Sequence, residues 1–129
     1  MTFLARQPLG KLTAARCISE AESIPVPFLW KILNTLKQYR LIRSFKGVHG
    51  GYELARPAGE ITVLAIVTAM DNLEGLNACV LGLPECNESH PCSMHGTWKE
   101  IRARTLVLFE QNTLADLFTP TERRKARAR

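Results

Sequence analysis

A helical pattern that is interrupted once, and then resumes with a clear apolar stripe, most constrains the first half of this sequence. The segment Ser23-Ile24-Pro25 interrupts helical periodicity, and Pro27 suits the first turn of a new helix that runs to about residue 39. The apolar residues of this helix recur at i, i+3, i+4 and i+7, as Leu29, Ile32, Leu33 and Leu36. A short helix over residues 14–22, with Thr13 as its N-cap, precedes the break. Two short helices joined by a tight turn predict a helix-turn-helix.

A β-hairpin is expected directly after the second helix. Residues 41–46 and 52–54 predict two short strands, and the segment 47–51, Gly-Val-His-Gly-Gly, predicts a glycine-rich turn between them. A hairpin in this position is called a wing. Residues 1–60 are therefore predicted to form a winged helix-turn-helix region.

The rest of the chain is predicted to be helical around one irregular segment. Residues 61–70 predict a core helix, and residues 95–111 predict a long helix, before a last turn over 114–118 that Thr113 can cap. Residues 71–94 follow neither period and hold three of the four cysteines. The fold class is thus mainly α with a small β-hairpin wing. Three parts are expected. Residues 1–60 form the winged region, and residues 122–129 form a basic, disordered tail. Between them, residues 61–121 contain the core helix, a cluster-binding loop over 78–95 and a long dimerisation helix.

The composition fits one folded domain inside the cell. A chain of 129 residues, 46% apolar and 22% charged, can bury one core and is not intrinsically disordered. No uncharged run exceeds ten residues, whereas a membrane-spanning helix needs roughly 20. The N-terminus lacks the regions of a secretory signal, so we expect a cytoplasmic protein. In that compartment four cysteines indicate metal or redox chemistry rather than disulfides.

Charge is segregated along the chain, although the net charge is only +5. Residues 23–52 contain five cations and no acid, whereas residues 57–98 contain five acids and no lysine or arginine. The last eight residues add five cations against one glutamate. The first block indicates a face that binds a polyanion, here double-stranded DNA. The alternative is a chance fluctuation on solvated faces.

The second helix is expected to present its polar side to DNA once the apolar stripe faces the core. Lysine can bind guanine edges and asparagine can bind adenine in the major groove, while a wing can reach phosphates. Two adjacent glycines also let the wing backbone turn tightly and approach another backbone. The predicted DNA-binding residues are Phe28, Trp30, Lys31, Asn34, Lys37, Arg43, Lys46, His49, Gly50 and Gly51. The alternatives are that Trp30 packs on a neighbouring subunit or helix, and that the lysines and His49 are only solvated.

Three cysteines in the irregular segment point to a metal centre. Cys79, Cys86 and Cys92 are separated by six and five residues, in a loop that contains glycine and proline. A zinc or iron–sulfur site then needs a fourth ligand, for which His95 is the nearest candidate and His90 the other. Zinc sites usually include a closely spaced cysteine pair, which is absent here. The spacing therefore favours a cluster of two or four irons over zinc, with three unrelated thiols as the remaining alternative.

No catalytic arrangement emerges from the sequence. There is no serine, histidine and acid arranged around a nucleophile elbow, and no phosphate-binding glycine loop opens a helix. The chain is accordingly not expected to be an enzyme. The fourth cysteine, Cys17, lies among alanines on the first helix and is expected to pack in the core.

These parts resemble a known family. The string Arg-Ser-Phe-Lys-Gly-Val-His-Gly-Gly-Tyr-Glu-Leu-Ala-Arg-Pro over residues 43–57, followed by three cysteines and a long helix, is similar to the Rrf2 family of bacterial winged helix-turn-helix regulators, which includes IscR, NsrR and CymR. The resemblance extends from about Leu12 to Phe118. Its most specific pieces are the Gly-Gly-Tyr-x-Leu-Ala-Arg-Pro wing and the cysteine triplet.

The resemblance implies a homodimer that binds a palindromic operator, with the helix over residues 95–111 as the dimerisation element. It also implies an iron–sulfur cluster on Cys79, Cys86 and Cys92. In the IscR-like branch a histidine three residues after the last cysteine completes a [2Fe–2S] site, and His95 stands there. NsrR-like members use other fourth ligands, including an acid from the partner's first helix, so a [4Fe–4S] cluster is the alternative.

The sequence departs from the family in three places. Only the end of the usual first helix, Leu4-Ala5, is expected to be present. The recognition helix carries Pro27 and Trp30 where relatives often have small polar or acidic residues, and His49 replaces a frequent wing glycine. The predicted function is a transcriptional regulator that senses iron–sulfur, redox or nitric oxide status through its cluster. The alternatives are a zinc-stabilised or apo DNA-binding repressor and a small iron–sulfur electron-transfer protein.

Overall fold

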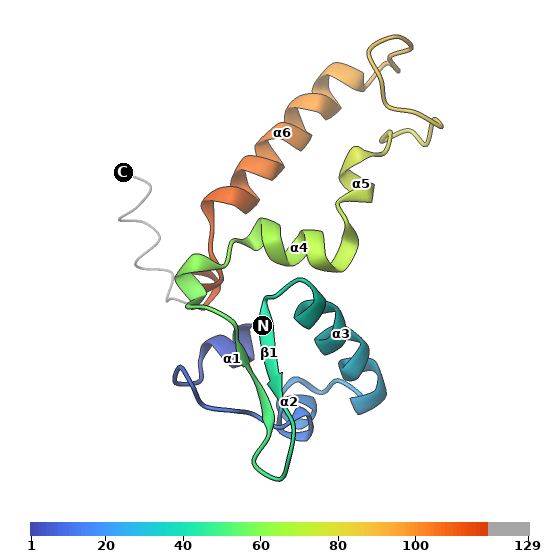
Figure 1. Ribbon diagram of the computed structural model, residues 1–129. Helices are drawn as coiled ribbons and strands as arrows, with labels where there is room; N and C mark the ends of the chain where they lie inside the picture. The colour runs from blue at the N-terminus through green and yellow to red at the C-terminus, as the bar shows by residue number, and fades with distance from the viewer. Residues whose placement is uncertain (119–129) are drawn as a thin grey trace.

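Helices dominate the computed structural model, which describes residues 1–118, and two short strands form one antiparallel hairpin (Figure 1). The elements in chain order are α1 (Thr2–Ala5), α2 (Ala15–Glu22), α3 (Val26–Gln38), β1 (Ile42–Phe45), β2 (Gly51–Leu54), the 3₁₀ turn η1 (Ala58–Glu60), α4 (Val63–Asp71), α5 (Glu74–Asn77), α6 (His95–Gln111) and the 3₁₀ turn η2 (Leu114–Leu117). The predicted tail over residues 122–129 lies outside the described residues. No helix in the described range is long and apolar enough to cross a membrane.

The elements form an N-terminal head and a projecting arm (Figure 1). The head contains α1, α2, α3 and the hairpin, and the arm contains α4, α5 and α6. The long helix α6 runs from the far end of the arm back toward the head, and the irregular segment between α5 and α6 lies at that far end. The mainly helical fold with a hairpin wing is as the sequence predicted.

The helix-turn-helix forms because α2 and α3 bury one face each. In α2 the buried residue is Ile18, and α3 buries the predicted stripe at Leu29, Leu33 and Leu36, with Ile32 half-buried. Burying each of these leucines stabilises the fold by about 1.5–3 kcal/mol. The helix α2 ends at Ser23, whose φ of 53° is left-handed and turns the chain toward α3.

Two expectations for α2 are wrong. Thr13 does not cap the helix, since Ala14 occupies the N-cap position without a side-chain hydrogen bond. Thr13 instead forms a β-bridge with Tyr52, whose backbone N–H donates to the Thr13 carbonyl at 2.9 Å. Cys17 is exposed rather than buried, because the face of this short helix that packs against the core carries Ile18 instead.

The wing pairs β1 with β2 in the register Ile42↔Leu54 and Phe45↔Gly51. Glycine is required at both positions after the turn. A Cβ on Gly50 would lie 2.2 Å from the Phe45 carbonyl oxygen, and one on Gly51 would lie 2.8 Å from the Thr13 backbone. The expected close backbone approach is therefore present, and it joins the wing to the strand-like residue Thr13.

The arm is tied to the head at its base. Ile61 and Leu114 are fully buried, and the Leu114 N–H donates to the Ile61 carbonyl at 2.7 Å. The N-cap of α4 is Thr62, whose hydroxyl accepts from the Ala65 N–H, and the predicted cap at Thr113 forms a capping box with Asp116. The Ile61–Leu114 bond joins the start of α4 to the end of α6, and both residues pack in the same buried cluster as Leu41 and Leu54 of the head.

Candidate metal centre and nucleic-acid interface

The cysteine-containing loop lies at the far end of the arm, between α5 and the first turn of α6 (Figure 1). His95 is the first residue of α6, and its backbone N–H donates to the Cys92 carbonyl at 3.0 Å. The start of the loop is held on the same helix by Trp98, whose indole N–H donates to the Ala78 carbonyl at 2.9 Å. The long helix thus positions both ends of the loop.

The structure places the three cysteines and His95 in two close pairs. Cys79 Sγ lies 3.8 Å from Cys92 Sγ, and Cys86 Sγ lies 3.7 Å from His95 Nδ1. Cys79 and His95 are buried, each 8% exposed, and the other two side chains are half-buried. His90, the second candidate ligand, is exposed. No three histidine, cysteine or acidic groups among residues 1–118 converge on a position for a single metal ion.

The surroundings of Cys79 favour the ionised form of its thiol, which is the form that binds metal. Backbone N–H groups of Leu81 and Leu83 lower the pKa of the Cys79 thiol, Cys92 and the Gly82 N–H lower it further, and desolvation acts against them. Near Cys86, the Arg102 guanidinium lies 4.0 Å from Sγ and 3.5 Å from the Leu76 carbonyl oxygen.

The donor set fits a metal-containing group. Thiolates and imidazole are ligands of iron and zinc, and two thiolates on one tetrahedral metal, with bonds of about 2.3 Å, lie about 3.8 Å apart. The Cys79–Cys92 separation of 3.8 Å matches this spacing, and the Cys86–His95 separation of 3.7 Å is close to it. In His95 it is Nδ1 that lies beside Cys86 Sγ, and the other ring nitrogen, Nε2, is buried without a hydrogen-bond partner.

Three residues near this site were not predicted from the sequence. Lys99 binds the carboxylate of Glu88, whose other oxygen lies 3.7 Å from His95 Nε2, and Lys99 lowers the pKa of the Glu88 carboxyl. The third residue is Arg102. Spacing could have revealed the two cations, because they follow His95 at i+4 and i+7 and so share its face of α6.

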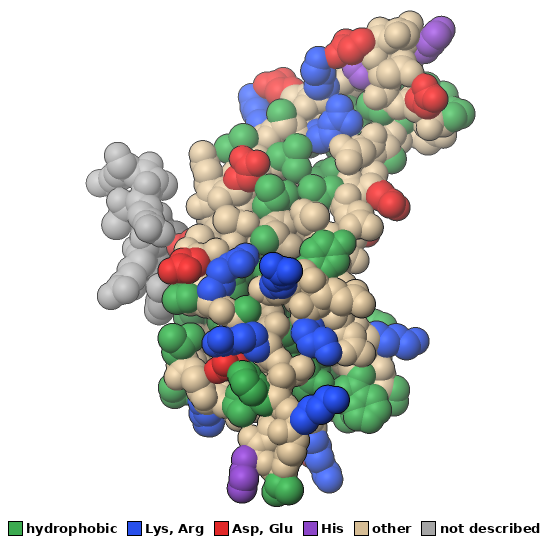
Figure 2. All heavy atoms as spheres, viewed as in Figure 1, with side chains coloured by type: hydrophobic (Ala, Val, Ile, Leu, Met, Phe, Trp, Pro, Cys, Tyr) green, Lys and Arg blue, Asp and Glu red, His purple; other side chains and the backbone are tan. Residues whose placement is uncertain are grey.

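The predicted DNA-binding residues lie on the head. On α3, Phe28 and Trp30 are 58% and 53% exposed, and the polar residues of the same face are exposed as well, namely Lys31, Asn34 and Lys37. On the wing, Lys46 and His49 are exposed near the turn. Figure 2 shows lysine and arginine side chains outnumbering acidic ones over the head, as the charge segregation predicts.

Three wing residues have structural roles of their own. The Arg43 guanidinium lies 2.9 Å from the carboxylate of Glu53, a buried acid on the opposite strand. Gly51 is buried and Gly50 half-buried, each against backbone. The two glycines therefore contribute to the shape of the wing.

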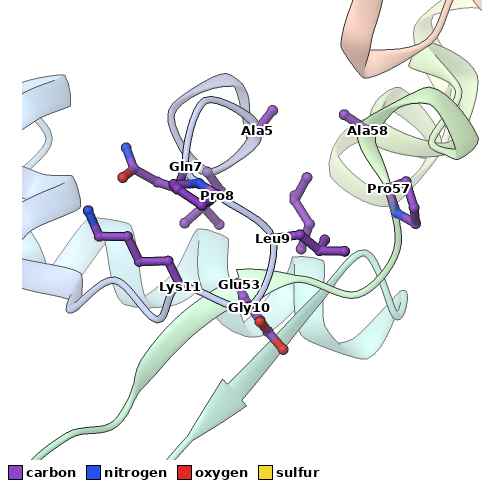
Figure 3. Close-up of a pocket in the computed structure, with 11 residues that line it drawn as sticks. Ala5, Gln7, Pro8, Leu9, Gly10, Lys11, Glu53, Pro57 and Ala58 are labelled. Carbon is purple, nitrogen blue, oxygen red and sulfur yellow. The ribbon is translucent and has the colours of Figure 1, made fainter.

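A cavity of about 260 Å³ lies between α1, with the loop that follows it, and the end of β2 (Figure 3). Leu4, Leu9, Leu54 and Pro57 supply apolar lining, and the charged side chains are those of Lys11 and Glu53. None of the cysteines lines this cavity.

A helix-turn-helix with a wing, carried beside a long C-terminal helix, defines a winged helix-turn-helix DNA-binding regulator. The chain belongs to the Rrf2 family, whose profile, described as "Iron-dependent Transcriptional regulator", matches residues 1–120. The protein is therefore a transcriptional regulator and not an enzyme, as the sequence predicted.

Individual relatives agree with this membership. The chain is 36% identical over 120 residues to the HTH-type transcriptional regulator Rv1287 of Mycobacterium tuberculosis, covering 91% of this chain and 73% of that protein. Its fold is similar to that of T. potens IscR, with a TM-score of 0.70, 21% identity and coverage of 90% and 75% of the two chains. It is also similar to CymR, the global cysteine regulator of B. subtilis, with a TM-score of 0.75, 23% identity and coverage of 92% and 88%.

Proposed function

We propose that this protein is a homodimeric regulator whose DNA binding responds to an iron–sulfur cluster held by Cys79, Cys86, Cys92 and His95. The observation that carries the proposal is the presentation of four donor atoms as two pairs, each at the spacing of two ligands on one tetrahedral metal. The description of the family as iron-dependent supports iron as the metal.

The two-pair geometry favours a [2Fe–2S] cluster over zinc. In such a cluster each iron takes two protein ligands, so Cys79 with Cys92 and Cys86 with His95 supply one pair to each iron. A single zinc ion instead needs its ligands around one point, and no three such groups converge among residues 1–118. A [4Fe–4S] cluster takes one ligand per iron and does not need paired donors.

The bound cluster supplies a centre that oxidation, iron loss or nitric oxide can alter. The protein's part is to link that centre to α6, since His95 begins this helix and Trp98 holds the loop on it. In the absence of the cluster we expect residues 79–95 to rearrange. Because α6 returns to the head at Leu114, a shift of this helix changes the relative position of the two recognition helices in a dimer.

The DNA contacts follow from the exposed face of the head. We assign groove contacts to Lys31, Asn34 and Lys37 on α3, with Phe28 and Trp30 beside them, and phosphate contacts to Arg43, Lys46 and His49 on the wing. We assign the surface that binds a second copy of the chain to α6, where the side chains of Ile101 and Leu108 are 48% and 56% exposed. Exposed apolar side chains on one helix face are typical of a subunit interface.

Anaerobic purification followed by visible absorption and iron and sulfide analysis tests the cluster. We expect a coloured protein with two irons per chain, whereas zinc gives no visible absorption. His95→Ala should make the cluster labile, and His95→Cys should retain it with an altered spectrum. Cys92→Ala should lose it, while Cys17→Ala, which removes an exposed thiol outside the site, should not.

The regulatory step is tested with operator DNA and the holo and apo proteins. We expect their affinities for the operator to differ, and Cys92→Ala to behave as the apo protein. An uncoloured, zinc-containing protein, or equal operator affinity with and without the cluster, contradicts the proposal.

A further inference from the structure

We infer that Glu88 is a positioning residue that holds the His95 imidazole with Nδ1 toward the metal centre and Nε2 away from it. The inference rests on the proposed function in that His95 is taken as a ligand. It goes beyond the proposed function in two respects. It identifies Nδ1 as the ligating atom of His95, and it identifies Glu88, which is not itself a ligand, as the residue that orients the ring.

The His95 ring lies between a thiol and a carboxylate. Its Nδ1 is 3.7 Å from Cys86 Sγ, and its Nε2 is 3.7 Å from Glu88 Oε2. The two nitrogens of an imidazole point in different directions, and in the neutral ring only one of them carries a proton. With Nδ1 directed at the cysteines, the proton belongs on Nε2.

Nε2 requires an acceptor at this position. His95 is 8% exposed, and its Nε2 is buried without a hydrogen-bond partner. An unsatisfied buried N–H costs about 1–3 kcal/mol. A side-chain shift of about 0.8 Å brings Glu88 Oε2 within ordinary hydrogen-bond length of Nε2. Satisfying this nitrogen therefore needs no rearrangement of the backbone.

Glu88 is held for this role from two sides. Its Oε1 binds the ammonium of Lys99, which lies one helical turn after His95 on the same face of α6. In the loop, the side chain of Asn87 donates to Glu85 at 2.7 Å and accepts from the His90 N–H at 2.9 Å, which fixes the turn that carries Glu88. One carboxylate thus spans Lys99 and His95.

The arrangement matches a general property of histidine ligands. The ring nitrogen that does not bind metal usually donates to a carboxylate or carbonyl, which fixes the tautomer and raises the basicity of the other nitrogen. Loss of such a partner typically costs 10–100-fold in metal affinity. Glu88 itself is 72% exposed, so its substitution does not remove core packing.

The first test uses the full-length apo protein and needs no cluster. Nitrogen-15 NMR of the histidine rings reports which nitrogen of neutral His95 carries the proton. We expect the Nε2–H tautomer in the parent and a mixture of tautomers in Glu88→Ala. Glu88→Gln should restore the parent tautomer, because its amide oxygen can still accept from Nε2. The matched control is Glu100→Ala, which removes an exposed acid of α6 that pairs with Arg104 and should match the parent.

The second test uses the cluster-loaded protein. Nitrogen hyperfine spectroscopy should report Nδ1 ligation in the parent, and a chelator should remove iron roughly ten-fold faster from Glu88→Ala than from the parent or Glu100→Ala. A parent tautomer in Glu88→Ala, an Ala-like tautomer in Glu88→Gln, or an unchanged rate of iron loss overturns the inference. If the parent binds no cluster at all, the proposed function fails, and the tautomers of the apo proteins still decide whether Glu88 positions the ring.

Discussion

At the scale of single residues, the two wing glycines have a structural role, because each lies close against another stretch of backbone. Both were predicted as part of the DNA-binding set, and a tight turn with a close backbone approach was expected there. The partner in that approach could not be predicted, because Thr13 lies far from Gly51 in sequence and carries its own cap-like signal. The β-bridge between Thr13 and Tyr52 explains why Gly51 lies against the Thr13 backbone and why Thr13 does not cap α2.

Gly51→Ala is expected to destabilise the protein by about 1–3 kcal/mol, because its Cβ would lie 2.8 Å from the Thr13 backbone. Chemical denaturation followed by circular dichroism measures this change. Gly59→Ala is the matched control, since nothing lies within 4 Å of a Cβ at that position. Equal midpoints for the two variants would show that the Thr13 contact can relax at no cost.

At the scale of elements, periodicity predicted the helices well. The long helix begins at His95 and ends at Gln111, as expected, and α3 differs from its predicted range by one residue at each end. The pattern failed where elements are short. The single turn α5 lies inside the segment that followed no period, because four residues are too few to show a 3.6-residue repeat.

Lys31→Ala and Lys46→Ala test the assignment of α3 and the wing to DNA. Each variant should bind operator more weakly, and each lost phosphate contact should reduce the slope of log affinity against log salt by about 1. Arg104→Ala is the control, because it removes a cation from α6 that pairs with Glu100. If both lysine variants retain the affinity and salt dependence of the parent, the groove assignment is wrong.

At the scale of the whole molecule, the two groups of candidate functional residues lie on different parts of the protein. The cation-rich surface lies on the head, and the paired metal-ligand candidates lie at the far end of the arm, joined to the head through α4 and α6 (Figures 1 and 2). The contact between Tyr39, at the end of α3, and Asn72, at the end of α4, links the recognition helix to the arm through a 3.1 Å hydrogen bond.

Leu108→Asp tests the proposed dimer. A charge at the centre of an apolar interface should shift the protein toward a monomer and weaken operator binding, because a palindromic site is bound by two recognition helices together. Analytical ultracentrifugation measures the shift. Ala103→Asp, at an exposed position of α6 away from Leu108 around the helix, should leave the dimer intact. A dimer of unchanged affinity in Leu108→Asp would place the interface elsewhere.

Local physics in the sequence determined the elements and the set of candidate ligands. The stripe from Leu29 to Leu36, the break at Pro25, the first-turn Pro27 and the cap at Thr113 all act within a few residues. They can therefore be recognised before any tertiary contact is known. The same is true of the spacing of the cysteines and His95, which predicted the site but not its geometry.

Only the tertiary structure decided how those residues meet. It paired Cys79 with Cys92 and Cys86 with His95, whereas spacing alone allowed several pairings. It also brought Glu88 to Lys99 and His95, because the loop folds back on α6. Such contacts join residues distant in sequence, and their geometry depends on how the loop packs on the helix, which no local pattern of residue types specifies.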